Sequence, residues 1–143
     1  MAKKQTTKAT WGWVIGKAPA PKLSASDKIR IEAQFADLVK RLGEEYCKEE
    51  TPEKDAQGLA YPISIYTKWY RNFLSICINC RNPHENAIAP YYEYKLARIE
   101  VVGKDAFKLA YFRHTGEWFT LPIDHNLETA IQSIETDPWF EMY

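Results

Sequence analysis

The spacing of apolar residues predicts a helix in the first third of the chain. Between about residues 27 and 47, apolar side chains recur every three or four positions among polar ones, the pattern of an amphipathic helix. Ser24, followed three residues later by Asp27, matches a capping box with Asp in place of Glu and locates the start of this helix. Its apolar stripe is formed by Ile31, Phe35, Leu38 and Leu42.

From Tyr61 onward, apolar residues alternate with polar ones, which is the period of β-strands. The alternation predicts a hairpin that turns at residues 71 and 72, a long third strand over residues 91–102, a fourth strand around residues 107–111 and a short last strand over residues 118–121. The return strand of the hairpin has one clean apolar face, made of Leu74, Ile76, Ile78 and Cys80.

A second helical pattern closes the chain. Asp124 or Asn126 can cap this helix, and apolar residues then recur at helical spacing as far as Ile134. No connection between the predicted strands is long enough for the crossover that parallel strands need. The sequence therefore predicts an α+β fold with an N-terminal helix, an antiparallel meander sheet of about five strands and a C-terminal helix.

Charge separates the beginning of the chain from the rest. The 143 residues have a formal net charge of 0, but residues 1–22 contain five lysines and no acidic residue. We therefore expect a basic arm over residues 1–22, extended or partly ordered, and a single α+β domain over residues 23–143. Trp11 and Trp13 form an apolar cluster within the arm, which either packs on the chain's own domain or anchors a partner.

Cysteine and glycine usage argues against several kinds of chemistry. Cys77, Cys80 and His84 give a C-x-x-C-x-x-x-H pattern that superficially offers ligands to zinc. Residues three apart in a strand point to opposite faces, however, so we interpret the two cysteines as structural and predict no metal site. Glycine-rich phosphate loops are absent, and we expect no cofactor.

Three cysteines and the lack of an apolar leader favour reduced thiols and a cytoplasmic protein. No run of residues approaches the roughly 18–20 apolar residues that would span a bilayer, so we expect no membrane association.

One position offers acid–base chemistry. His114 lies beside Arg113 at the mouth of the last predicted hairpin, where it is the best candidate for a general base or a phosphate contact. In the alternative interpretation, His114 is a turn residue whose side chain hydrogen-bonds to nearby backbone. The chain has no motif that ties a nucleophile to a base, so we predict no catalytic residue. A hydrolase using His114, Arg113 and Glu117 is the least supported function.

Basic and aromatic residues alternate in the first predicted hairpin, where Lys68, Trp69 and Arg71 occur within four positions. Arg81, Arg98 and Arg113 fall on or near neighbouring strands. A sheet face with both residue types stacks bases and contacts phosphates in nucleic-acid-binding proteins. In the alternative, the rings enter the core while the cations lie along the other face.

Two blocks carry a resemblance, residues 66–72 (YTKWYRN) and residues 111–118 (YFRHTGEW). Both resemble those of a group of small uncharacterised bacterial proteins, and the similarity runs from the Trp-Gly-Trp of the arm to Asp137-Pro138-Trp139-Phe140. The resemblance implies a bacterial, cytoplasmic source and a compact α+β domain. It carries no catalytic role.

Together these patterns favour a non-enzymatic protein-interaction domain that binds a protein partner or a second copy of itself. The alternative is a nucleic-acid-binding protein that uses the basic arm and an aromatic and basic face of the sheet. The candidate binding residues are Trp11, Trp13, Lys68, Trp69, Arg71, Arg113, His114 and Trp118.

Overall fold

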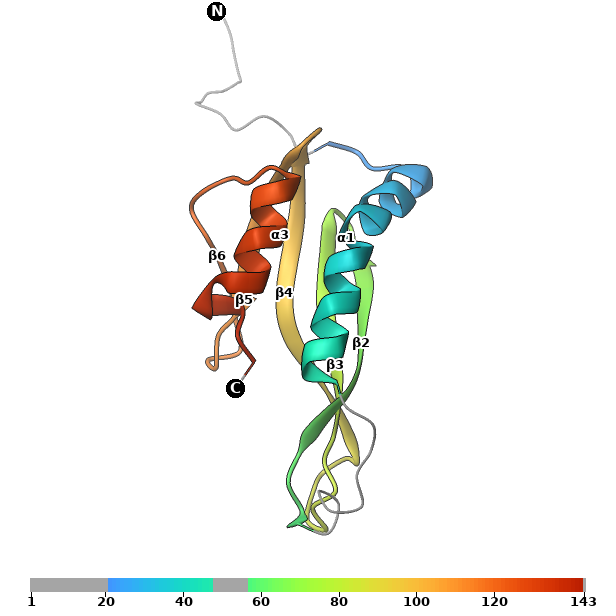
Figure 1. Ribbon diagram of the computed structural model, residues 1–143, viewed down its shortest axis with the longest axis vertical. Helices are drawn as coiled ribbons and strands as arrows, with labels where there is room; N and C mark the ends of the chain where they lie inside the picture. Colours follow the sequence, from blue (N-terminus) through green and yellow to red (C-terminus); the bar gives the residue numbers. More distant parts are fainter. Residues whose placement is uncertain (1–20, 48–56, 143) are drawn as a thin grey trace, which may run out of the picture.

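The computed structural model describes residues 21–47 and 57–142. Two helices, α1 (Ala25–Tyr46) and α3 (Leu127–Thr136), lie on one face of a five-stranded antiparallel sheet (Figure 1). The order of strands in the sheet is their order in the chain, so the sheet is a meander. The predicted α+β fold is therefore confirmed. The predicted arm, with Trp11 and Trp13, lies outside the described residues except for its last two.

The strands follow the predicted alternation closely. They are β2 (Tyr61–Tyr70), β3 (Phe73–Arg81), β4 (Tyr91–Gly103), β5 (Ala106–Phe112) and β6 (Trp118–Thr120). After α3, a short 3-10 helix, η1 (Pro138–Phe140), lies near the end of the chain.

The core lies between the helices and the sheet. The predicted stripe of α1 is buried, and so is the apolar face of β3, whose four members are each 0% exposed. Phe35 of α1 meets Phe107 of β5 edge to face, with ring centroids 5.4 Å apart. Both helices begin at capping boxes, at Ser24 and at Asn126, which satisfy amide groups that the first helical turn leaves free.

Glycine 43 does not end α1, although glycine often ends helices. The helix continues to Tyr46, and at Gly43 it passes so close to β2 that a Cβ atom would lie 2.8 Å from Ile65 Cγ2. The missing side chain therefore permits a close approach between helix and strand.

The pairing of β3 with β4 contains one irregularity that matters for the exposed surface. Ile76 pairs with Ala97, but the next residue, Cys77, pairs with Lys95, so Leu96 is an extra residue in β4. Without this bulge, Lys95 would share the helix-covered face with Ala97. The bulge turns Lys95 to the opposite face of the sheet.

The two thiols of β3 lie on opposite sides of the strand, because Cys80 packs in the core under the helices and Cys77 lies on the other face. Over residues 21–47 and 57–142, no group of three His, Cys, Asp or Glu side chains is placed to hold a metal. No helix in this part of the chain is long and apolar enough to cross a membrane.

Candidate functional site

The face of the sheet opposite α1 and α3 carries charged and aromatic side chains, and no helix of the described residues covers it (Figure 1). We call this surface the open face. Along each strand, residues of the open face alternate with residues of the buried face, and paired residues of neighbouring strands share a face. Its members are Tyr66, Lys68, Tyr70, Phe73, Ser75, Cys77, Asn79, Glu93, Lys95, Arg98, Glu100, Lys108, Ala110, Phe112, Trp118 and Thr120.

Arg98 of β4 lies near the centre of the open face, between two aromatic rings. Its guanidinium carbon is 4.3 Å from the ring centroid of Phe73 and 4.9 Å from that of Trp118. Burial lowers the pKa of Arg98, and the nearby Glu100 only partly opposes this effect. The buried Nε has no hydrogen-bond partner among the described residues. The rings thus lie beside a cation whose Nε–H group has no hydrogen-bond acceptor among the described residues.

Beside Arg98, a carboxylate links two lysines. Lys68 Nζ lies 2.8 and 2.9 Å from the two oxygens of Glu93, and Lys95 Nζ lies 3.6 Å from one of them. The Tyr66 hydroxyl also donates to Glu93. Burial raises the pKa of Glu93, but the hydrogen bonds from Lys68 and Tyr66 outweigh it and hold this pKa at about 2. Glu93 is therefore ionised at neutral pH and neutralises one of the surrounding cations.

Arg98 and the two lysines border a cavity of about 200 Å³ in the open face, which we call the Arg98 cavity. Ser75 and the fully buried Cys77 lie on the central strand of its wall. Burial raises the pKa of Cys77 to about 11, so its thiol stays protonated and is a poor nucleophile. The residues that line the cavity are Lys68, Tyr70, Phe73, Ser75, Cys77, Lys95, Arg98 and Trp118.

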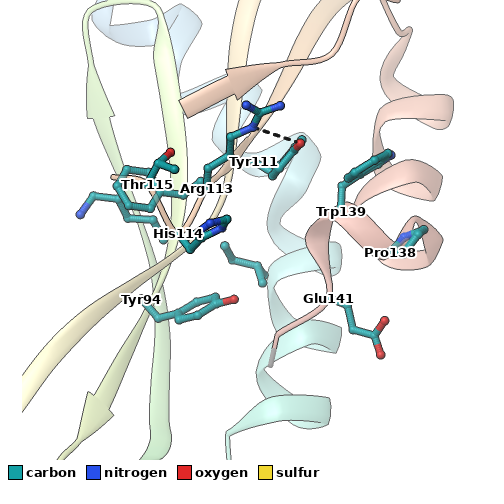
Figure 2. A pocket seen from close by; sticks show the side chains of 11 residues that line it. Tyr94, Tyr111, Arg113, His114, Thr115, Pro138, Trp139 and Glu141 are labelled. Atoms are coloured by element: carbon teal, nitrogen blue, oxygen red, sulfur yellow. Dashed lines mark hydrogen bonds between the residues drawn. The ribbon is translucent and has the colours of Figure 1, made fainter. Parts of the chain in front are cut away.

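A second hollow of about 320 Å³, the hairpin pocket, lies between the β5–β6 turn and the C-terminal segment (Figure 2). Trp139 stacks on Tyr111, with centroids 5.1 Å apart and an interplanar angle of 20°. Arg113 Nε donates to the Tyr111 hydroxyl at 3.4 Å, and its guanidinium carbon lies 4.1 Å from the centroid of Phe119. This arginine is thus held against the rings of its own hairpin.

His114 lines the hairpin pocket but is exposed to solvent (Figure 2). No group in the described part of the chain hydrogen-bonds its imidazole. Glu117, the carboxylate that the sequence offers as a partner, does not line the pocket, and its backbone carbonyl accepts from Arg113 N at 2.8 Å. The nucleophile and oriented base that hydrolysis by acyl transfer needs are not assembled among these residues.

A model of one known protein family matches most of the chain. Residues 27–141, from the first turn of α1 to the residue after η1, match the model of DUF3024, a domain of unknown function. The chain belongs to the DUF3024 family. The resemblance to an uncharacterised family is thereby confirmed. No curated protein and no solved structure matches this DUF3024 chain.

The structure distributes the predicted site residues of this DUF3024 domain over several places. Lys68 and Trp118 line the Arg98 cavity, whereas Arg113 and His114 line the hairpin pocket. Trp69 lies on the helix-covered face, packed against the core with Lys28 Nζ 5.4 Å from its ring centroid. The other predicted residues lie at the β2–β3 turn or outside the described residues: Arg71, Trp11 and Trp13.

Phe73 and Lys95 are among the cavity residues that the sequence patterns did not single out. In the sequence, Phe73 is an ordinary strand residue after a turn, and no local pattern predicts its contact with Arg98. For Lys95 the sequence does contain a signal, because strict alternation would place this lysine among the buried positions of β4. A charge at an apolar position of a strand points to a bulge.

Proposed function

We propose that this DUF3024 domain is a non-enzymatic binding domain whose open face takes single-stranded nucleic acid. The observation that carries the proposal is Arg98, a cation held between Phe73 and Trp118 with unmet hydrogen-bonding capacity and with Lys68 and Lys95 beside it. Cations next to rings suit a partner that alternates phosphates with flat bases.

Charge supports an anionic partner. The members of the open face named above include four cations and two carboxylates, which are Lys68, Lys95, Arg98, Lys108, Glu93 and Glu100, and Lys108 is paired with Asp124. Residues 1–22 contain five of the chain's 19 lysines and arginines and none of its 19 acidic residues. Residues 23–143 therefore have 14 basic and 19 acidic residues, a net charge of −5. The positive open face therefore belongs to an otherwise acidic domain. A second copy docked through the same face would bring cation against cation, which disfavours self-association there.

Aromatic residues favour nucleic acid over an acidic protein segment. Tyr70 is 65% exposed at the edge of the Arg98 cavity, and Tyr66 is 36% exposed on the same strand. Bases stack on such rings whatever their sequence, at about 1–3 kcal/mol per base. An acidic peptide would use the cations and leave the rings exposed.

The attachment of the arm agrees with this proposal. Asn72 Nδ2 donates to the backbone oxygen of Pro21 at 2.5 Å, which fixes the end of the predicted arm beside the β2–β3 turn. Tyr70 and Phe73 flank that turn on the open face. Pro21, which follows four lysines in the sequence, thus lies at this end of the proposed binding surface.

Fluorescence anisotropy with labelled oligonucleotides tests the proposal. We expect the full chain to bind a single strand more tightly than a duplex, with an affinity that falls as salt rises from about 50 to 200 mM. Replacing both Lys68 and Lys95 by Gln should weaken binding about tenfold or more, because two phosphate contacts are lost. Lys40→Gln, an exposed change on α1, is the matched control and should have no effect.

Two results would contradict the proposal. One is the absence of binding to any oligonucleotide at low salt. The other is an equal loss of affinity in the Lys40→Gln control, which would show that only bulk charge matters. A protein partner, the function that the sequence patterns favour, would then be the better explanation of the open face.

A further inference from the structure

We propose that the Arg98 cavity binds a terminal phosphate, that is, a phosphate monoester at the end of a strand or on a free mononucleotide. This inference rests on the proposed function and deepens it, because it names the group that the concave part of the open face would take. Three features support it: the local charge, the shape of the cavity and the fixed position of Arg98.

The local charge matches a dianion. Lys68, Lys95 and Arg98 line the cavity, and Glu93 pairs with both lysines. The three cations exceed this paired carboxylate by two charges, and Glu100, which lies near Arg98 but does not line the cavity, offsets part of that excess. A phosphodiester inside a strand carries one negative charge, whereas a phosphate monoester carries about 1.5 to 2 at neutral pH.

The shape of the cavity also favours a chain end. It is a hollow of about 200 Å³, walled by Tyr70, Phe73 and Trp118 and backed by β3. The backbone of a nucleic acid leaves an internal phosphodiester on both sides, so that group suits an open surface better than a hollow. A monoester presents three free oxygens on one side and a single ester link on the other, so it can enter such a hollow end first.

The position of Arg98 reduces the cost of binding. Contacts with Phe73 and Trp118 restrain the guanidinium, whose carbon lies 4.3 and 4.9 Å from the two ring centroids, before any ligand arrives. A planar guanidinium can donate two parallel hydrogen bonds to phosphate oxygens, which the ammonium group of lysine cannot. Arg98 is thus the group expected to distinguish the monoester from other anions.

A competition experiment separates the possible sources of this phosphate. The probes are one single-stranded sequence with a 5′-phosphate, a 3′-phosphate or hydroxyl ends, together with a nucleoside monophosphate and inorganic phosphate. We expect one phosphorylated end to bind about tenfold more tightly than the hydroxyl-ended strand at pH 7. This preference should shrink below about pH 6, where the monoester takes up a proton.

Arg98→Met tests the residue itself. Methionine fills the space between the two rings without charge, so we expect the preference for a phosphorylated end to disappear while the folded state persists by circular dichroism. Lys40→Met is the matched control, since Lys40 is exposed on α1, on the opposite side of the sheet from the cavity. If Arg98→Met fails to fold, Lys68→Gln, at an exposed side chain, replaces it and should reduce the same preference.

The outcomes distinguish the two proposals. Equal binding of phosphorylated and hydroxyl-ended strands overturns the terminal-phosphate site and leaves single-strand binding intact. Arg98-dependent binding of the nucleoside monophosphate, without binding of any strand, supports the site and overturns the proposed function. If no phosphate-bearing probe binds, the terminal-phosphate site is overturned.

Discussion

The two faces of β3 share one backbone and have opposite physical roles. On the helix side, Leu74, Ile76 and Ile78 are fully buried against α1 and the neighbouring strands. On the open side, Phe73 and Ser75 border a cavity with three cations. Apolar burial stabilises the first face without regard to direction, whereas the second depends on fixed pairings between particular rings and charges.

Substitutions on the two faces should therefore affect different properties, stability on one and binding on the other. A change on the helix side removes buried contacts and lowers the free energy of unfolding. A change on the open side alters groups that are partly solvated, so it costs little stability but removes a contact that a partner would use.

Phe35→Ala should have the largest effect. Phe35 is 0% exposed and meets Phe107 edge to face across the core, so its truncation removes buried area and leaves a cavity. We expect a loss of about 3–5 kcal/mol in the free energy of unfolding, measured by urea titration.

Tyr70→Ala is the matched aromatic truncation on the open face. Its exposed ring should contribute less than about 1 kcal/mol to stability, while its loss should weaken binding of a single strand by about 1–3 kcal/mol. Comparable losses of stability in Phe35→Ala and Tyr70→Ala would end the distinction between the two faces.

The ionisation of Glu93 makes the stability of the fold depend on pH. Its pKa is about 2 in the folded protein against an ordinary value of 4.5, so its pairing with Lys68 stabilises the fold above about pH 5 and is lost as the pH falls toward 2. Allowing for solvent at a partly exposed pair, we expect this to remove about 1–2 kcal/mol between about pH 7 and pH 3.

Glu93→Gln should lack this component, so its stability should fall less steeply with acid than that of the unchanged protein in urea titrations at each pH. Glu100→Gln on the same strand and face provides the control, because Glu100 forms no ion pair with a lysine among the described residues. Parallel pH profiles for the unchanged protein and Glu93→Gln would show that the cluster adds nothing to stability.

The elements were predictable because each buries one periodic set of side chains. The stripe that includes Phe35 repeats at helical spacing, and Ile76 and Ile78 of β3 alternate with polar neighbours, so sequence alone locates α1 and β3. The same alternation places Trp69 with Ile65, on the face that the structure packs against the core.

The cavity was less predictable for two physical reasons. Its side chains come from β2, β3, β4 and β6, and the register that brings Lys68, Arg98 and Trp118 together is set by strand pairing rather than by any local pattern. The bulge at Leu96 also reverses the side on which Lys95 points, which a strict period of two does not allow.

His114→Ala should have the smallest effect, and it defines the limit of the binding surface. The side chain is exposed and has no hydrogen-bond partner in the described part of the chain, so stability should change by less than about 0.5 kcal/mol. Because His114 lines the hairpin pocket rather than the Arg98 cavity, affinity for a single strand should also stay within about twofold in the anisotropy assay. A tenfold or greater loss would mean that the partner extends past Lys95, which borders both hollows, and around the β5–β6 turn. The contrast between two faces would then give way to one continuous surface that joins them.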